Sequence, residues 1–187
     1  MSYPTVIIGI IALLILHPAP ALSQESSKPT ETPSAFEGFL LSWPDEEGWK
    51  AANKQENDKT FFIEVLRRGE TFENWTQLGT MASYKRARVQ DISTVPEIYH
   101  DLFKKRCPDV RLTVHTVEAN REHPRVLFSL DCPKFTDGSK SESSVWIVTQ
   151  GKQAVYVTHR SIREASVPED LRSKWIEWLK TGEVVTK

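Results

Sequence analysis

Beyond the first segment, the side chains best suited to catalysis or metal binding are those of four histidines and two cysteines. The histidines are His100, His115, His123 and His159. A zinc site needs three or four converging ligands, and no two of these histidines have the four-residue spacing of a helical metal motif. Glycine-rich phosphate loops and the usual serine or cysteine nucleophile motifs are also missing. The sequence therefore predicts no metal and no cofactor, and it favours a protein that is not an enzyme.

One histidine keeps a catalytic alternative open. A hydrolase can assemble its site from residues that lie far apart in the sequence, and His159 is the candidate base. This alternative requires a concave pocket in which His159 meets an acid and a hydroxyl within hydrogen-bond reach. An isolated His159 on a flat sheet would exclude it.

The two cysteines carry a structural prediction. Cys107 and Cys132 form an even pair, which usually becomes a disulfide in an exported chain. The chain contains no C-x-x-C motif, so a metal-binding or reactive pair of thiols is the less favoured reading. A bridge would close a loop of about 25 residues and stabilise the fold by about 3.5 kcal/mol in the loop-entropy model.

The first segment is typical of an export signal. Residues 1–23 carry no Lys, Arg, Asp or Glu and include an apolar run from Thr5 to Leu16. Two prolines and several small residues follow, which places a cleavage site between Ser23 and Gln24. The run is shorter than the roughly 20 residues of a membrane span. We expect a cleaved signal peptide and a periplasmic or secreted protein, with an uncleaved N-terminal anchor as the alternative.

The rest of the chain divides into a leader and one domain. Residues 24–35 are polar and contain two prolines, which is typical of a disordered leader. Residues 36–187 are then expected to form a single domain. The full chain has 24 Lys and Arg against 25 Asp and Glu, and this balance argues against nucleic acid as a partner.

Apolar patterning predicts strands along most of the domain. The expected strands are 36–43, 60–67, 75–86, 110–117, 125–132, 145–150 and 154–159, while 49–59 is ambiguous. Two Ser/Thr-Val-Pro-Glu segments predict capped helix starts at Thr94 and Ser166. The expected apolar faces of the helices are Ile98, Leu102 and Phe103 in the first, and Leu171, Trp175, Trp178 and Leu179 in the second. We expect an α+β fold, an antiparallel meander with both helices packed on one face and one disulfide.

Two short segments resemble a pattern in a known group of proteins. The segment Gly69–Thr76, followed by Thr80 and by Tyr156–Arg160, is similar to small uncharacterised secreted proteins of proteobacteria. The resemblance implies a periplasmic or secreted α+β domain and transfers no activity or catalytic residue. Asn74-Trp75-Thr76 also fits the N-glycosylation pattern, which in a eukaryote would mark an exposed loop.

The function favoured by the sequence is non-enzymatic binding of a protein partner or a small ligand. Aromatic side chains dominate binding hot spots, so Trp43, Trp49 and Tyr156 are candidate anchors beside His159. Each aromatic is also a candidate core residue, and burial distinguishes the two roles. The third alternative is attachment to the cell envelope, through an uncleaved N-terminus or through the basic clusters at 84–88 and 104–106.

Overall fold

The computed structural model of the chain describes residues 36–44 and 48–186. The predicted signal peptide, the cleavage site between Ser23 and Gln24 and the predicted leader lie outside these residues. None of the helices in the described part is long and apolar enough to cross a membrane.

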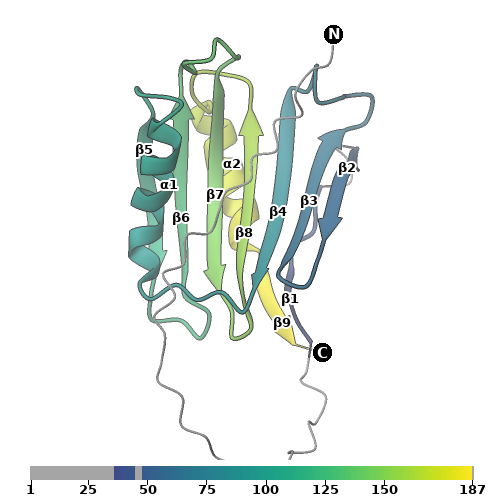
Figure 1. Ribbon diagram of the computed structural model, residues 1–187, viewed down its shortest axis with the longest axis vertical. Helices are drawn as coiled ribbons and strands as arrows, with labels where there is room; N and C mark the ends of the chain where they lie inside the picture. The colour runs from purple at the N-terminus through teal and green to yellow at the C-terminus, as the bar shows by residue number, and fades with distance from the viewer. Residues whose placement is uncertain (1–35, 45–47, 187) are drawn as a thin grey trace, which may run out of the picture. The chain divides into compact units, whose positions relative to one another are not determined.

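An antiparallel sheet of seven strands forms the centre of the described domain (Figure 1). Its strand order is β2-β3-β4-β8-β7-β6-β5. The strands are β2 (Trp49–Glu56), β3 (Thr60–Arg67), β4 (Gln77–Lys85), β5 (Arg111–Glu118), β6 (Arg125–Cys132), β7 (Glu142–Gln150) and β8 (Ala154–Ile162). Two meanders, β2 to β4 and β5 to β8, therefore meet where β4 pairs with β8. The segment left ambiguous by the sequence forms the edge strand β2.

A second, two-stranded sheet joins the ends of the described chain. It pairs β1 (Glu37–Leu40) with β9 (Glu183–Thr186) in antiparallel register. The sequence predicted a longer first strand and did not predict β9. Phe39 of β1 stacks on Tyr156 of β8 with ring centroids 5.7 Å apart, which attaches this small sheet to the large one.

The helices begin close to the predicted positions, but the predicted capping contacts are not made. They are α1 (Val95–Lys104), preceded by the 3-10 turn η2 (Ile92–Thr94), and α2 (Glu169–Lys180). Neither residue at the N-terminal cap, Thr94 or Pro168, makes a side-chain cap hydrogen bond. The Thr94 hydroxyl instead donates to the carbonyl oxygen of Asp91.

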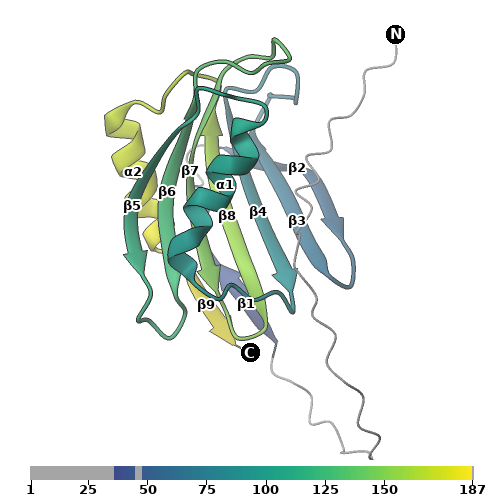
Figure 2. The same cartoon turned by 60° about the vertical axis from the view of Figure 1, so that its left-hand side comes forward.

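The two helices lie on opposite faces of the large sheet (Figures 1 and 2). Tyr99 of α1 packs against Phe128 and Trp146, with ring centroids 5.7 and 4.9 Å away. Trp175 of α2 packs in a different core cluster that includes Leu127. Because successive strand residues point to opposite faces, Phe128 and Leu127 belong to different sides of the sheet. Packing of both helices on one face, as predicted, is therefore not confirmed.

The rotation of α1 also differs from the prediction. Tyr99 is buried against the sheet, whereas Ile98 and Leu102 are 53% and 37% exposed. His100 lies on the opposite side of α1 from Ile98 and Leu102, with Nε2 3.4 Å from the Val110 carbonyl oxygen next to β5. The two exposed residues therefore lie on the flank of α1 that faces away from β5.

The predicted disulfide is present in the structure. Cys107 follows α1 and Cys132 ends β6, and their sulfur atoms are bonded across a Cα–Cα distance of 6.0 Å. Both cysteines are fully buried. The bond joins the end of α1 to the sheet, and the two helices, the antiparallel sheet and the disulfide together confirm the α+β class.

Candidate functional site

The structure separates the four predicted binding residues onto two faces of the sheet. Tyr156 lies on the face that α2 covers, where Trp43 and Trp49 also pack, and His159 lies on the face of α1. Tyr156 is only 5% exposed, and its hydroxyl donates to the Glu37 carboxylate. Burial excludes the role of exposed anchor predicted for Tyr156.

Trp43 and Trp49 belong to an aromatic cluster with Trp178 of α2. The Trp43 ring centroid lies 5.0 Å from that of Trp49 and 4.6 Å from that of Trp178. All three rings are half-buried. Because the rings cover one another, this geometry favours the core interpretation of Trp43 and Trp49 over a flat binding platform.

A buried arginine lies at the centre of the same cluster. The guanidinium carbon of Arg160 is 4.7 Å from the ring centroids of both Trp49 and Trp175. Arg160 Nε and Nη2 donate to Gln77 Oε1 at 3.2 and 2.6 Å. A cation held over aromatic faces and hydrogen-bonded is a stable arrangement in a protein interior. The cluster connects β2, β8 and α2, and its role is structural.

His159 contacts a hydroxyl directly and reaches an acid only through that hydroxyl, which is less than the hydrolase alternative requires. Its ring stacks on Trp146 at 3.8 Å, and its Nδ1 lies 3.2 Å from Ser161 Oγ. The Ser161 hydroxyl is also hydrogen-bonded to the Glu142 carboxylate. Burial lowers the pKa of His159 to about 3, so the imidazole is neutral at physiological pH. Burial raises the pKa of Glu142, and the Ser161 hydrogen bond opposes that shift.

The order of these three groups does not support acyl transfer. In a catalytic triad the imidazole lies between the acid and an accessible nucleophilic hydroxyl. Here the Ser161 hydroxyl lies between Glu142 and His159, and Ser161 is 0% exposed. A substrate carbonyl cannot reach this hydroxyl. The arrangement instead satisfies the hydrogen bonds of buried polar groups.

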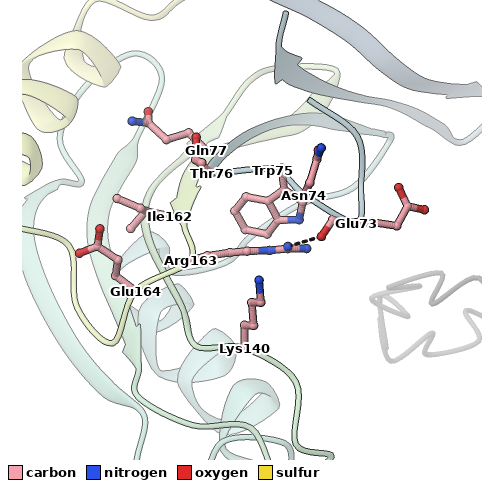
Figure 3. A pocket seen from close by; sticks show the side chains of 9 residues that line it. All are labelled: Glu73, Asn74, Trp75, Thr76, Gln77, Lys140, Ile162, Arg163 and Glu164. Atoms are coloured by element: carbon pink, nitrogen blue, oxygen red, sulfur yellow. Dashed lines mark hydrogen bonds between the residues drawn. The ribbon is translucent and has the colours of Figure 1, made fainter. Parts of the chain in front are cut away.

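A pocket of about 510 Å³ adjoins this network at the ends of β4 and β8 (Figure 3). The side chains that line it are Glu73, Asn74, Trp75, Thr76, Gln77, Lys140, Ile162, Arg163 and Glu164. The last registered pair between β7 and β8 is Ser143 with Ile162, so Glu142 and Arg163 occupy the next position on each strand. The positive charge of Arg163 acts to lower the pKa of Glu142. The pocket and the network around His159 are therefore neighbours.

Arg163 is fixed in place within this pocket. Its Nη1 and Nη2 donate to the carbonyl oxygens of Glu73 and Phe72 at 2.6 and 2.8 Å. Its guanidinium carbon lies 4.5 Å from the ring centroid of Trp75. Trp75 in turn packs in a buried cluster with Leu66 and Leu78. These contacts hold the planar guanidinium in one orientation before any ligand binds.

A second cation, Lys140, lines the same pocket as Arg163. Figure 3 shows the amino group of Lys140 pointing toward the guanidinium of Arg163. Within the described part of the chain, neither Lys140 nor Arg163 forms a salt bridge with a carboxylate. Two positive charges therefore line this pocket without a salt bridge to any described residue. The Glu73 carboxyl is near enough that, after its hydrogen bond with Thr71, the charge of Arg163 also helps to lower its pKa.

Local hydrogen bonds shape the loop that Arg163 contacts. Asn74 Oδ1 accepts from the backbone N–H of Thr71 at 2.6 Å. The hydroxyl and the backbone N–H of Thr76 both donate to Glu70 Oε1. The polar residues of the Asn74-Trp75-Thr76 pattern thus hold the loop in shape, while Trp75 supplies the pocket's aromatic surface.

The basic clusters proposed for envelope binding have partners within the fold. Lys85 forms a salt bridge with Glu56 at 3.6 Å, and Arg88 Nη1 donates to the Gly151 carbonyl oxygen at 2.8 Å. Arg106 pairs with Asp137 at 3.1 Å. These contacts give Lys85, Arg88 and Arg106 partners within the fold, while Lys104 and Lys105 are exposed.

Comparison with known proteins found no family model that matches the chain and no curated protein that is similar to it. The resemblance to small secreted proteins of proteobacteria stays a prediction. Among the described residues, no group of three or more His, Cys, Asp or Glu side chains is placed to hold a metal ion.

The buried carboxylate of Glu37 provides a test of how the ends of the domain are held. It accepts hydrogen bonds from the backbone N–H groups of Lys152 and Gln153 at 2.7 and 2.9 Å. Burial raises the pKa of Glu37, but the hydrogen bonds from Gln153, Lys152 and Tyr156 outweigh this and hold it below its ordinary value of 4.5.

Replacing Glu37 with glutamine should lower the free energy of unfolding at neutral pH by about 1–3 kcal/mol, because charge-assisted hydrogen bonds are lost. A depressed folded-state pKa contributes stability above the unfolded value, and that stability is lost as pH falls through the folded pKa. Urea unfolding should therefore show the difference between wild type and E37Q shrinking below pH 4.5. A difference independent of pH would contradict the role of the ionised carboxylate.

Proposed function

We propose that this protein is an exported, non-enzymatic domain that binds a small ligand with an anionic group in the pocket of Trp75, Lys140 and Arg163. The observation that carries the proposal is that Lys140 and Arg163 both line the pocket, with Lys140 pointing toward Arg163, and that neither forms a salt bridge among the described residues. The volume of about 510 Å³ is within the range of small-molecule sites, which is roughly 300–1,000 Å³.

The chemistry of the lining indicates the class of ligand. Arginine and lysine recognise carboxylate and phosphate groups through charge-assisted hydrogen bonds. Trp75 and Ile162 supply apolar surface for the rest of the ligand. Glu73 and Glu164 also line the pocket, so a polyanion would be repelled. A compact molecule with one acidic group and an apolar or planar part fits these features best.

The proposed location is the periplasm or the cell exterior. The Cys107–Cys132 disulfide supports export, because such bonds form and persist in oxidising compartments. N-terminal sequencing of the exported protein tests this part. A first residue of Gln24 fits a cleaved signal, and retention of residues 1–23 would favour the membrane-anchored alternative.

Titration with simple anions tests the pocket itself. Acetate and inorganic phosphate should shift the NMR signal of the Trp75 indole N–H in a saturable way. Arg163→Gln and Lys140→Gln should each weaken binding about tenfold or more, since a charge-assisted hydrogen bond contributes about 1.5–3 kcal/mol.

The matched control is Lys134→Gln, which removes the same charge from an exposed side chain of the same loop but outside the pocket. This variant should bind the anions like wild type. Equal weakening by all three variants would indicate general charge attraction, and the absence of any saturable shift in wild type would refute the proposed pocket.

A further inference from the structure

One edge of the seven-stranded sheet, β5, exposes two valines and pairs with no further strand of the described residues. β5 ends the strand order, and Figure 1 shows no described strand or helix beyond it. Val114 and Val117 of β5 are 46% and 44% exposed. An edge strand presents unpaired backbone N–H and C=O groups, and natural proteins usually protect such edges with charged residues, prolines or bulges.

The opposite edge, β2, is protected in this way. Its exposed side chains include Lys50, Lys54 and Glu56, and a register shift interrupts it between Ala51 and Asn53. β5 also has a register shift, between Val114 and Thr116. The extra residue there is His115, whose ring turns back to Ser129 of β6 at 2.6 Å and so adds no charge to the open edge.

The sequence of β5 is complementary to itself in antiparallel orientation. A twofold axis between Val114 and His115 places Arg111 opposite Glu118 of a second copy, whose carboxylate also pairs with Arg121 and Arg125 of its own chain. The same axis places Leu112 opposite Val117, and Thr113 opposite Thr116. Opposite charges, apolar pairs and threonine pairs are all favourable across neighbouring strands.

The pairing with β6 shows that the members of each pair share a sheet face. Leu112 and Val117 stand opposite Leu130 and Val126, which are separated by an even number of residues and so lie on one face. Arg111 and Glu118 stand opposite Asp131 and Arg125 of β6, which lie together on the other face. The extra residue at His115 therefore keeps the two members of each of these pairs on the same face of the sheet.

We propose that two copies of this chain pair through β5 and join their seven-stranded sheets into one continuous antiparallel sheet. The interface is isologous, because the same strand serves both copies. The exposed Val114 and Val117 are then covered by the partner. The net charge of −1 leaves little electrostatic repulsion between copies.

Sedimentation velocity of the full chain at micromolar concentration tests the proposal. Wild type should sediment with twice the mass of one chain. Val117→Lys should raise the dimer dissociation constant about tenfold or more, since it places a charge in the apolar pair with Leu112. Ala52→Lys, which adds the same charge to the exposed β2 edge, should leave the dimer intact.

Arg111→Glu provides a second test on an exposed side chain, because it sets two carboxylates opposite each other in each pair. It should also weaken the dimer, with an unchanged circular dichroism spectrum. A monomeric wild type would overturn the proposal. A dimer that survives both β5 substitutions would overturn it as well, as would one that only Ala52→Lys dissociates.

Discussion

Replacing Asp131 with alanine should lower the free energy of unfolding by about 3–5 kcal/mol, because it removes the buried counter-ion of Arg172 and leaves only the exposed carboxylate of Glu169, 3.5 Å away. Asp131 Oδ2 lies 3.0 Å from Arg172 Nη2, and both side chains are buried. Asp131 Oδ1 also accepts from the backbone N–H of Val167 at 3.1 Å. The substitution thus releases the start of α2 from β6, and denaturant unfolding measures the loss.

A double variant separates the loss of the ion pair from the cost of leaving a buried cation without Asp131. Asp131→Leu combined with Arg172→Met removes both charges and fills their space, so it should cost less than Asp131→Ala alone. Arg172 Nη1 is buried with no hydrogen-bond partner among the described residues, so the cation already lacks full compensation. A loss below about 1 kcal/mol for Asp131→Ala would contradict a buried ion pair, since exposed pairs contribute that little.

Replacing Trp175 with alanine should have an effect of similar size, about 3–5 kcal/mol, because large buried aromatic side chains leave cavities when truncated. Trp175 is one of the largest fully buried side chains in the described chain and packs with Leu127, Val145 and Leu179. Its ring also lies under the guanidinium of Arg160. Chemical unfolding monitored by far-ultraviolet circular dichroism is the appropriate measurement.

Trp175→Phe is the matched control for that substitution. The Trp175 indole N–H is buried without a hydrogen-bond partner within the described residues, so its removal leaves no other group unpaired. Phenylalanine keeps an aromatic face under Arg160 and leaves a smaller cavity than alanine, so this variant should lose clearly less stability than Trp175→Ala. Equal losses for the two variants would show that cavity formation is not the cause.

Much of the fold was predictable from local pattern. The alternation at 125–132, the glycine-containing turn at Gly151 and the Val-Pro-Glu segments indicated strands and helices that the structure contains. The cysteine pair also indicated its disulfide. The strand, turn and helix patterns each lie within a short segment, and the disulfide was inferred from the expected export of the chain. None of these predictions required the tertiary arrangement.

The arrangement of the helices was not predictable in the same way. Every residue of β6 is buried, because α1 covers one face of the central strands and α2 the other. The unbroken apolar run from Val145 to Val148 was the feature of the sequence that indicated a strand buried on both faces of the sheet. Ile98 and Leu102 follow helical spacing, yet Tyr99 and Phe103 take the inward positions because they meet Trp146.

The candidate pocket was also missed by sequence reasoning. Lys140 and Arg163 belong to separate segments with no spacing motif between them, and only the return of β8 beside β4 brings Arg163 to Trp75. The Gly69–Thr76 segment was the one available signal, and it forms a wall of the pocket. His159, chosen as a candidate, lies in the adjoining hydrogen-bond network.

The most direct test of ligand binding in this pocket is mass spectrometry of small molecules released from the protein purified from its native source. Wild type should carry a compound with a carboxylate or phosphate group that is absent from the Lys140→Gln and Arg163→Gln variants and present in Lys134→Gln. A wild-type protein that releases no such compound, or releases it in equal amounts with the pocket variants, would contradict the proposed function.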